Sequence, residues 1–194
     1  MKKSVLVYFL LEVVFILGCN LGGEDCGVLT SSNPYVEDIT ARMVRYMGYN
    51  NVTPINSEDT ISYHDMVIWM DVEPYYLSQD QSIGYQSLWA CSPVYPNLNN
   101  EIKELKIVAS LDFNDTIPAG TDMTEYFNFR TFDGVENVSN LTLLNAYFQS
   151  DYYFFLSPGI NLDKEKNLQF DVRIILDNSR VFDLTTPRVK ALVN

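Results

Sequence analysis

The chain has 194 residues, with 13 lysines and arginines against 25 aspartates and glutamates, so its formal net charge at pH 7 is -12. Binding to nucleic acid rests on basic side chains that neutralise phosphates, and this balance therefore argues against a nucleic-acid partner. It argues equally against direct adsorption to anionic lipid headgroups. One histidine and three cysteines leave few residues for a zinc site or for nucleophilic catalysis.

Residues 1 to 18 form a predicted signal peptide. Lys2 and Lys3 precede an apolar run that extends from residue 5 to residue 17. This run is too short for a membrane-spanning helix, which needs about 20 residues. It ends in the segment ILGC (16 to 19), which resembles the bacterial lipobox. The resemblance implies that Cys19 is acylated and begins the mature chain, and an ordinary signal peptide with an incidental Cys19 is the alternative.

Residues 19 to 34 are polar and rich in glycine and serine, which predicts a tether ahead of a single domain over residues 35 to 194. Two cysteines besides Cys19 remain, Cys26 and Cys91. In an exported protein such a pair is a candidate disulfide. The bridge would close a loop of about 65 residues, worth about 3 to 5 kcal/mol in the chain-entropy model. Two buried free thiols are the alternative.

Several short segments of the predicted domain have the pattern of β-strands. Residues 103 to 113 and 168 to 176 alternate between apolar and polar side chains, as half-buried strands do. Asp177-Asn178-Ser179 then predicts a hairpin turn into a strand at 181 to 184. Residues 66 to 72 and 151 to 157 are shorter apolar strands. Residues 38 to 47 fit a strand or a helix, and residues 137 to 149 predict a helix capped by Asn137 or Ser139.

Short strands separated by turn signals are typical of an all-β sandwich. The 13 tyrosines and 11 phenylalanines suit the core and the strand faces of such a fold. We therefore expect an all-β fold, an immunoglobulin-like antiparallel β-sandwich that can include one short helix.

A group of aromatic residues lies in the loop-rich stretch 73 to 97. Exposed tyrosine and tryptophan rings on sandwich loops can stack on sugar rings, because they are rigid and amphipathic. The alternative, which we favour, is that these rings cap the end of the sandwich. The candidate ligand-stacking residues are Tyr75, Tyr76, Trp89 and Tyr95.

The motifs of common enzymes do not occur in the sequence. His64 would have to serve any catalytic triad, and neither a G-x-S-x-G motif nor a phosphate-binding glycine loop is present. We therefore expect no catalytic residue, no cofactor and no metal, and we interpret His64 as structural. The turn at 112 to 115 could supply oxygens for calcium, but a solvated turn is the preferred interpretation.

Two identical tripeptides, Asp-Thr-Ile at 59 to 61 and at 115 to 117, resemble the sequon for O-glycosylation in Bacteroidetes. That resemblance makes Thr60 and Thr116 candidate glycosylation sites. Together with the lipobox, the segments WACSP around Cys91, IKELKIVASLDFN, IPAGTDMTEYF and FDLTTPRVKAL resemble a family of uncharacterised Bacteroidetes lipoproteins of about 200 residues, a domain of unknown function. The family resemblance implies an exported, lipid-anchored β-sandwich and transfers no functional residues.

These features predict a lipid-anchored protein of the outer membrane, on its periplasmic face or at the cell surface. Glu24 and Asp25 resemble a surface-display signal but lie later than its usual position, so both faces remain open. The preferred function is a non-enzymatic interaction or accessory module with an envelope protein or a glycan as partner. The alternatives are a carbohydrate-binding surface lipoprotein and a pilin- or adhesin-like subunit that pairs through an edge strand, such as the C-terminal one.

Overall fold

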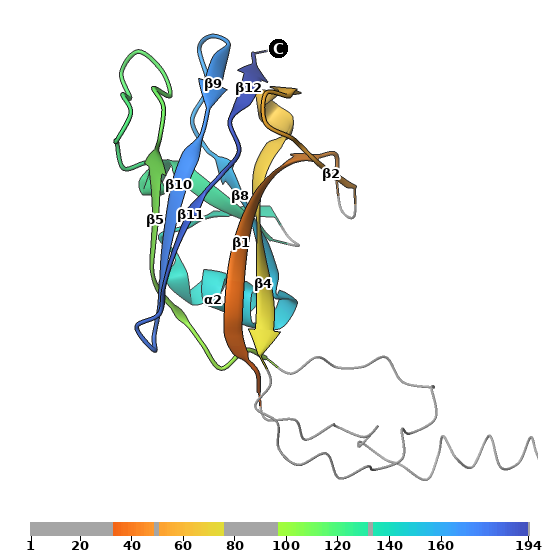
Figure 1. Ribbon diagram of the computed structural model, residues 1–194, viewed down its shortest axis with the longest axis vertical. Coiled ribbons are helices and arrows are strands. Elements are labelled where there is room, and N and C mark those ends of the chain that lie inside the picture. The colour runs from red at the N-terminus through yellow and green to blue at the C-terminus, as the bar shows by residue number, and fades with distance from the viewer. Residues whose placement is uncertain (1–32, 49–50, 76–96, 132–133, 194) are drawn as a thin grey trace, which may run out of the picture. The chain divides into compact units, whose positions relative to one another are not determined.

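The computed structural model describes residues 33–48, 51–75, 97–131 and 134–193 (Figure 1). They belong to one compact unit made of Asn33–Leu77 and Asn97–Asn194. The α-helix of this unit is α2 (Leu141–Asp151), and two short 3₁₀ turns are η1 (Tyr63–Asp65) and η2 (Thr124–Tyr126). The strands are β1 (Tyr35–Tyr46), β2 (Val52–Pro54), β3 (Thr60–Ser62), β4 (Met66–Tyr75), β5 (Ile102–Ala109), β6 (Phe127–Thr131), β7 (Gly134–Asn137), β8 (Tyr153–Pro158), β9 (Lys166–Leu168), β10 (Phe170–Leu176), β11 (Val181–Thr185) and β12 (Val189–Leu192).

The strands of this unit form three sheets. The largest is six-stranded, in the order β2-β1-β4-β8-β6-β7, and the others are β11-β10-β5 and β3-β12-β9. Every pairing of named strands is antiparallel except that of β12 with β3. This arrangement confirms the expected all-β, antiparallel, sandwich-like fold with one short helix among the described residues.

The core lies between the inner faces of the six-stranded sheet and the β11-β10-β5 sheet. Phe127 of β6 meets Phe170 of β10 across this interface, with ring centroids 5.2 Å apart in an edge-on contact. Helix α2 adds Leu144 and Phe148 to the same buried cluster. Burial on this scale is the main source of stability for a domain of this size, at roughly 25 cal/mol for each square ångström of apolar surface.

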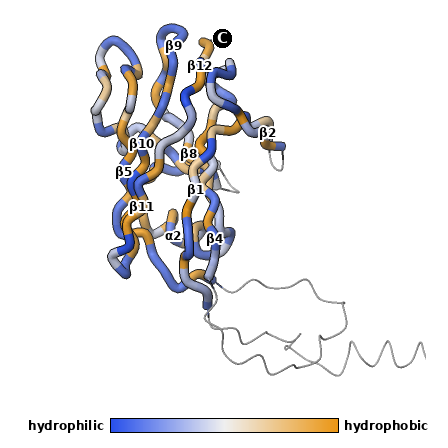
Figure 2. Tube along the Cα trace, viewed as in Figure 1, coloured by the Kyte–Doolittle hydropathy of each residue, from blue (hydrophilic) through white to orange (hydrophobic). Residues whose placement is uncertain are grey.

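The alternating strands predicted from the sequence are confirmed, although the first ends at Ala109 rather than at residue 113. The buried positions take every second residue along β10 and along β5 from Leu105 onward, and Figure 2 shows the matching alternation of hydrophobic and hydrophilic positions. The hairpin between β10 and β11 turns where expected, with Ser179 in the left-handed region at φ 66°. The ambiguous segment 38–47 is a strand, because β1 pairs with β2 on one side and with β4 on the other.

Two further expectations are wrong, one about the start of the helix and one about the place of the C-terminal strand in its sheet. The helix begins later than predicted, and its N-cap is Asn140, whose side-chain oxygen accepts a hydrogen bond from the backbone N–H of Leu143. Asn137 instead stabilises the preceding turn, where its side-chain oxygen accepts from the N–H of Ser139. The C-terminal strand β12 is not an edge strand, because β3 and β9 flank it on both sides.

The buried side-chain amide of Asn100 links the start of β1 to the hairpin between β10 and β11. The side-chain oxygen of Asn100 accepts from the N–H of Val36 at 2.9 Å, and its nitrogen donates to Asp177 at 3.0 Å. Together with the backbone N–H groups of Glu101 and Asn178, this donor holds the pKa of Asp177 below its ordinary value. These bonds satisfy groups that would cost free energy if they were buried without partners.

Candidate functional site

The outer face of the six-stranded sheet, the face turned away from the core, carries four neighbouring aromatic rings. Trp69 alternates along β4 with core residues, and Tyr153 and Phe155 alternate along β8 in the same way. The rings of Trp69 and Phe155, on paired residues of adjacent strands, have centroids 5.9 Å apart. Tyr46 of β1 joins them, 5.6 Å from Phe155, and Tyr153 lies 5.6 Å from Phe155 and 6.2 Å from Trp69. We call Tyr46, Trp69, Tyr153 and Phe155 the ring cluster.

A second apolar layer lies beside the ring cluster. Val44 and Val67 face each other on β1 and β4 and are fully buried, although neither belongs to the core between the sheets. They stand two residues from Tyr46 and Trp69 respectively, on the same face. The indole Nε1 of Trp69 is also buried, and it has no hydrogen-bond partner among the described residues. Around Trp69 and Val67 the outer face is therefore apolar rather than the solvated polar face typical of an exposed sheet. Arg42, which pairs with Trp69 across the strands, forms an ion pair with Asp71 on the same face.

Arg130 of β6 borders the ring cluster. Its guanidinium carbon lies 4.5 Å from the centroid of the Tyr46 ring, which is the geometry of a cation–π contact. The Nε of Arg130 is buried without a hydrogen-bond partner. Within the part of the chain that the structure describes, no carboxylate forms an ion pair with this side chain. Among the described residues, the contact with the Tyr46 ring is thus the one charge-stabilising contact of Arg130.

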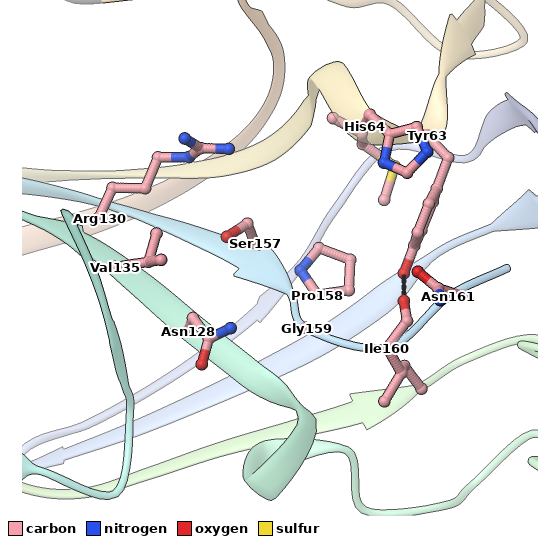
Figure 3. A pocket seen from close by; sticks show the side chains of 11 residues that line it. Tyr63, His64, Asn128, Arg130, Val135, Ser157, Pro158, Gly159, Ile160 and Asn161 are labelled. Atoms are coloured by element: carbon pink, nitrogen blue, oxygen red, sulfur yellow. Dashed lines mark hydrogen bonds between the residues drawn. The ribbon is translucent and has the colours of Figure 1, made fainter. Parts of the chain in front are cut away.

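An open pocket of about 280 Å³ lies next to Arg130 (Figure 3). Arg130 and Val135 stand at one end, and His64 and Asn161 stand at the other, with Ser157 between them. The lining residues are Tyr63, His64, Met66, Asn128, Arg130, Val135, Ser157, Pro158, Gly159, Ile160 and Asn161, and none of these is an aspartate or a glutamate. The pocket is therefore rich in neutral polar groups and cationic at one end.

The hydroxyl of Tyr63 closes one side of the pocket. It donates a hydrogen bond to the carbonyl oxygen of Ile160, as Figure 3 shows. Burial raises the pKa of this hydroxyl above its ordinary value, because desolvation disfavours the phenolate. Tyr63 is therefore a neutral donor that fixes the loop after β8, and its oxygen is already engaged within the protein.

Most of the residues singled out in the sequence are not part of this surface. Tyr75 ends β4 opposite Tyr35 of β1, and it is 48 % exposed at the far end of the strand pair. The remaining candidates, Cys19, Cys26, Tyr76, Trp89, Cys91 and Tyr95, lie outside the described residues. Sugar stacking by these loop aromatics and the disulfide of the two cysteines stay predictions.

The two threonines of the Asp-Thr-Ile tripeptides are both exposed. Thr60 begins β3, where it pairs with Lys190. Thr116 lies in the loop after β5, and its hydroxyl donates to the side-chain oxygen of Asn114 at 2.9 Å. Neither threonine lines the pocket beside Arg130.

The turn considered for calcium uses its oxygens internally. Asp112 accepts a hydrogen bond from the backbone of Ala119, and Asp115 pairs with Lys164 at 2.7 Å and with Lys166 at 3.6 Å. These two lysines hold the pKa of Asp115 below its ordinary value, chiefly through the hydrogen bond from Lys164. Across the described ranges, no three or more metal-ligating side chains gather at one place.

The fold and the outer face define an all-β sandwich with an aromatic surface and an adjoining polar pocket. Within the described part of the chain, no helix has both the length and the apolar character needed to cross a membrane. No protein-family model, no curated protein and no solved structure matches the chain. The function must therefore be argued from the surface itself.

Sequence reasoning missed the ring cluster and Arg130, although a signal was present. Residues 66 to 70 of β4 and residues 152 to 156 around β8 are apolar at consecutive positions rather than at alternate ones. Such continuous apolar runs indicate strands that are covered on both faces. For Arg130 no comparable signal exists, because its neighbours come from strands that are distant in the sequence.

The second apolar layer predicts a cost for truncating Val67, whose exposed fraction is 0 %. Val67→Ala should lower the free energy of unfolding by about 2 kcal/mol, since each buried methylene contributes about 0.8 kcal/mol and a cavity adds to the loss. Val181→Ala is the matched control, because Val181 is also on a strand but is 48 % exposed; its effect should stay within about 0.5 kcal/mol. Urea unfolding of both variants makes the comparison. Equal small effects would show that the outer face has no buried apolar layer.

Proposed function

We propose that this protein is a lipid-anchored protein of the outer membrane that acts as a non-enzymatic binding module, with the outer face of the six-stranded sheet as its binding surface. The carrying observation is that the ring cluster lies next to an open pocket and to Arg130, which has no carboxylate partner among the described residues. Apolar surface that a monomer leaves partly open is typical of an interaction site. The proposed anchor at Cys19 would hold this surface close to the membrane, on the periplasmic face or at the cell surface.

The chemistry of the surface favours a glycan over an envelope protein as the ligand. Aromatic rings offer flat apolar faces to the C–H faces of a sugar ring, and amide and hydroxyl groups suit its hydroxyls. Arg130 links the two kinds of group, because it contacts the Tyr46 ring of the cluster and also lines the pocket, where Asn128 and Ser157 supply an amide and a hydroxyl. Carbohydrate binding is therefore our leading candidate, and its surface is the sheet face rather than the loops at 73 to 97.

The proposed anchor and the proposed modifications are tested together by peptide mass spectrometry of the protein purified from its producing bacterium. We expect the mature chain to begin at an acylated Cys19, with glycans on Thr60 and Thr116 and a Cys26–Cys91 disulfide. Cys19→Ser should abolish acylation and move the protein out of the membrane fraction, because the acyl chains supply the membrane affinity. An unmodified Cys19 within a longer or differently cleaved chain would contradict the lipoprotein assignment.

Carbohydrate binding is tested by native electrophoresis of the full-length protein, in mild detergent, through gels that contain single polysaccharides. At least one polysaccharide should retard the wild-type protein. Tyr46→Ala should lose the retardation, because stacking on an aromatic ring contributes about 1 kcal/mol or more. Tyr75→Ala should keep it, since Tyr75 lies at the far end of β4.

Two results would contradict this proposal in different ways. An unchanged mobility across a broad panel would contradict carbohydrate binding and leave an envelope protein as the partner. Loss of retardation in Tyr75→Ala, with Tyr46→Ala unaffected, would move the binding site from the sheet face to the strand end. Thermal unfolding of both variants shows whether a lost retardation reflects lost folding.

A further inference from the structure

The electrostatics around Arg130 are unusual for this chain. The net charge is -12. Of the other arginines on described strands, two pair with carboxylates, and Arg45 of β1 donates a hydrogen bond to the backbone carbonyl of Thr60 at 3.4 Å. Arg42 of β1 lies 3.8 Å from Asp71, and Arg173 of β10 lies 2.8 Å from Asp183. Arg130 has no such partner among the described residues, and its guanidinium carbon lies over the ring of Tyr46. A guanidinium without a carboxylate retains its capacity for two parallel hydrogen bonds to an incoming anion.

Among the described residues, none of the side chains that line the pocket beside Arg130 is negatively charged. Asn128, Ser157 and Asn161 contribute amide and hydroxyl groups, and His64 contributes an imidazole ring. A ligand carboxylate at the Arg130 end would therefore meet neutral groups and one cation, and no carboxylate that lines the pocket would repel it. The charge of this pocket is complementary to an anion, although the chain as a whole is acidic.

The size and the composition of the surface decide which anion fits. The volume of about 280 Å³ is near the low end for ligand pockets, roughly 300 Å³ and above, and suits a single sugar unit of a longer chain. A phosphate group carries up to two charges and is usually bound by several cations or by a helix N-terminus, whereas one arginine matches one carboxylate. A fatty acid would need an enclosed apolar cavity, whereas this pocket is open and largely polar.

We propose that the outer face binds a carboxylated sugar chain of the polyuronate class, with Arg130 bound to the carboxylate of one sugar unit and the ring cluster in contact with neighbouring units. Three features of the described residues carry this inference: Arg130 has no carboxylate partner among them, its guanidinium lies over the Tyr46 ring, and the described lining of the adjoining pocket includes no carboxylate. It rests on the proposed glycan-binding function and specifies the ligand of the same site. The carboxylate determines selectivity, and the aromatic contacts contribute affinity that any similar sugar chain can share.

The test uses two probes that differ only at the carboxylate, oligogalacturonate and its methyl ester. Calorimetric titration of the full-length protein in mild detergent should give at least about tenfold tighter binding of the acid form, equivalent to about 1.4 kcal/mol. Arg130→Gln should bind both probes with equal affinity. Arg130→Lys keeps the charge but loses the two parallel hydrogen bonds, so its preference should fall between those of wild type and Arg130→Gln. Arg173→Gln, which removes an exposed arginine from the other sheet, should keep the wild-type preference.

The outcomes separate this inference from the function on which it rests. Equal binding of both probes by the wild-type protein, abolished by Tyr46→Ala, would overturn the role of Arg130 and keep glycan binding. A preference for the acid form that persists in Arg130→Gln would also overturn it. No binding of either probe, with retardation by a neutral polysaccharide in the gels, would overturn the polyuronate class alone. No binding in either experiment would overturn both proposals. Arg130→Lys provides the comparison if Arg130→Gln fails to fold.

Discussion

The burial of β4 on both of its faces is the constraint on which the rest of this structure depends. Ile68 and Met70 point into the core between the sheets, whereas Val67 and Trp69 point to the opposite side. A strand that is apolar on both faces must lie inside a sheet and needs cover on each side. The neighbours β1 and β8 supply the pairing, and the ring cluster lies on the outer face. The core face therefore determines the fold, and the outer face determines where a ligand can bind.

The outer face also explains why an acidic protein has a local site for an anion. Arg130 lies against the face of Tyr46 and forms no ion pair with a described carboxylate, so its guanidinium keeps its capacity to bind a negative group. Two of the carboxylates that pair with other basic side chains lie away from this surface, Asp183 on β11 and Asp115 in the loop after β5. Asp71 of β4 lies on the outer face, where it forms an ion pair with Arg42 and does not line the pocket. Net charge describes the solubility of the whole molecule, whereas recognition depends on the few groups that line the pocket.

The sequence predicted the strand pattern well because local periodicity follows from burial on one face. The alternation in β5 and β10 and the turn at Asp177 to Ser179 required no knowledge of other strands. The helix was predicted, but its N-cap was not, because Asn137, Ser139 and Asn140 offer competing caps within four residues and Asn140 is the one that accepts from the N–H of Leu143. The central position of β12 was also missed, since an interior place depends on β3 and β9, which are remote in the sequence.

The candidate site was predicted less well than the fold. The candidate ligand-stacking rings were placed in the stretch 73 to 97, and Tyr75 is the one of these rings that the structure describes. The ring cluster lies instead on three strands of the six-stranded sheet. The consecutive apolar residues of β4 indicated a covered outer face, but not which side chains cover it. The contact between Arg130 and Tyr46 joins β6 to β1, strands that are not adjacent in the sheet, and local sequence patterns do not encode such a contact.

The most direct test of the central claim is whether a ligand covers the outer face in the cell envelope, where we propose that the protein is anchored. Val135 lines the pocket and is 54 % exposed, whereas Val181 on β11 is 48 % exposed. We would replace each in turn by cysteine and measure the rate of maleimide labelling in envelope fragments and in the purified full-length protein, with the parent chain as background. A ligand on the outer face predicts slower labelling of Val135→Cys in the envelope and an unchanged rate for Val181→Cys. Equal rates for Val135→Cys in both preparations would contradict the account.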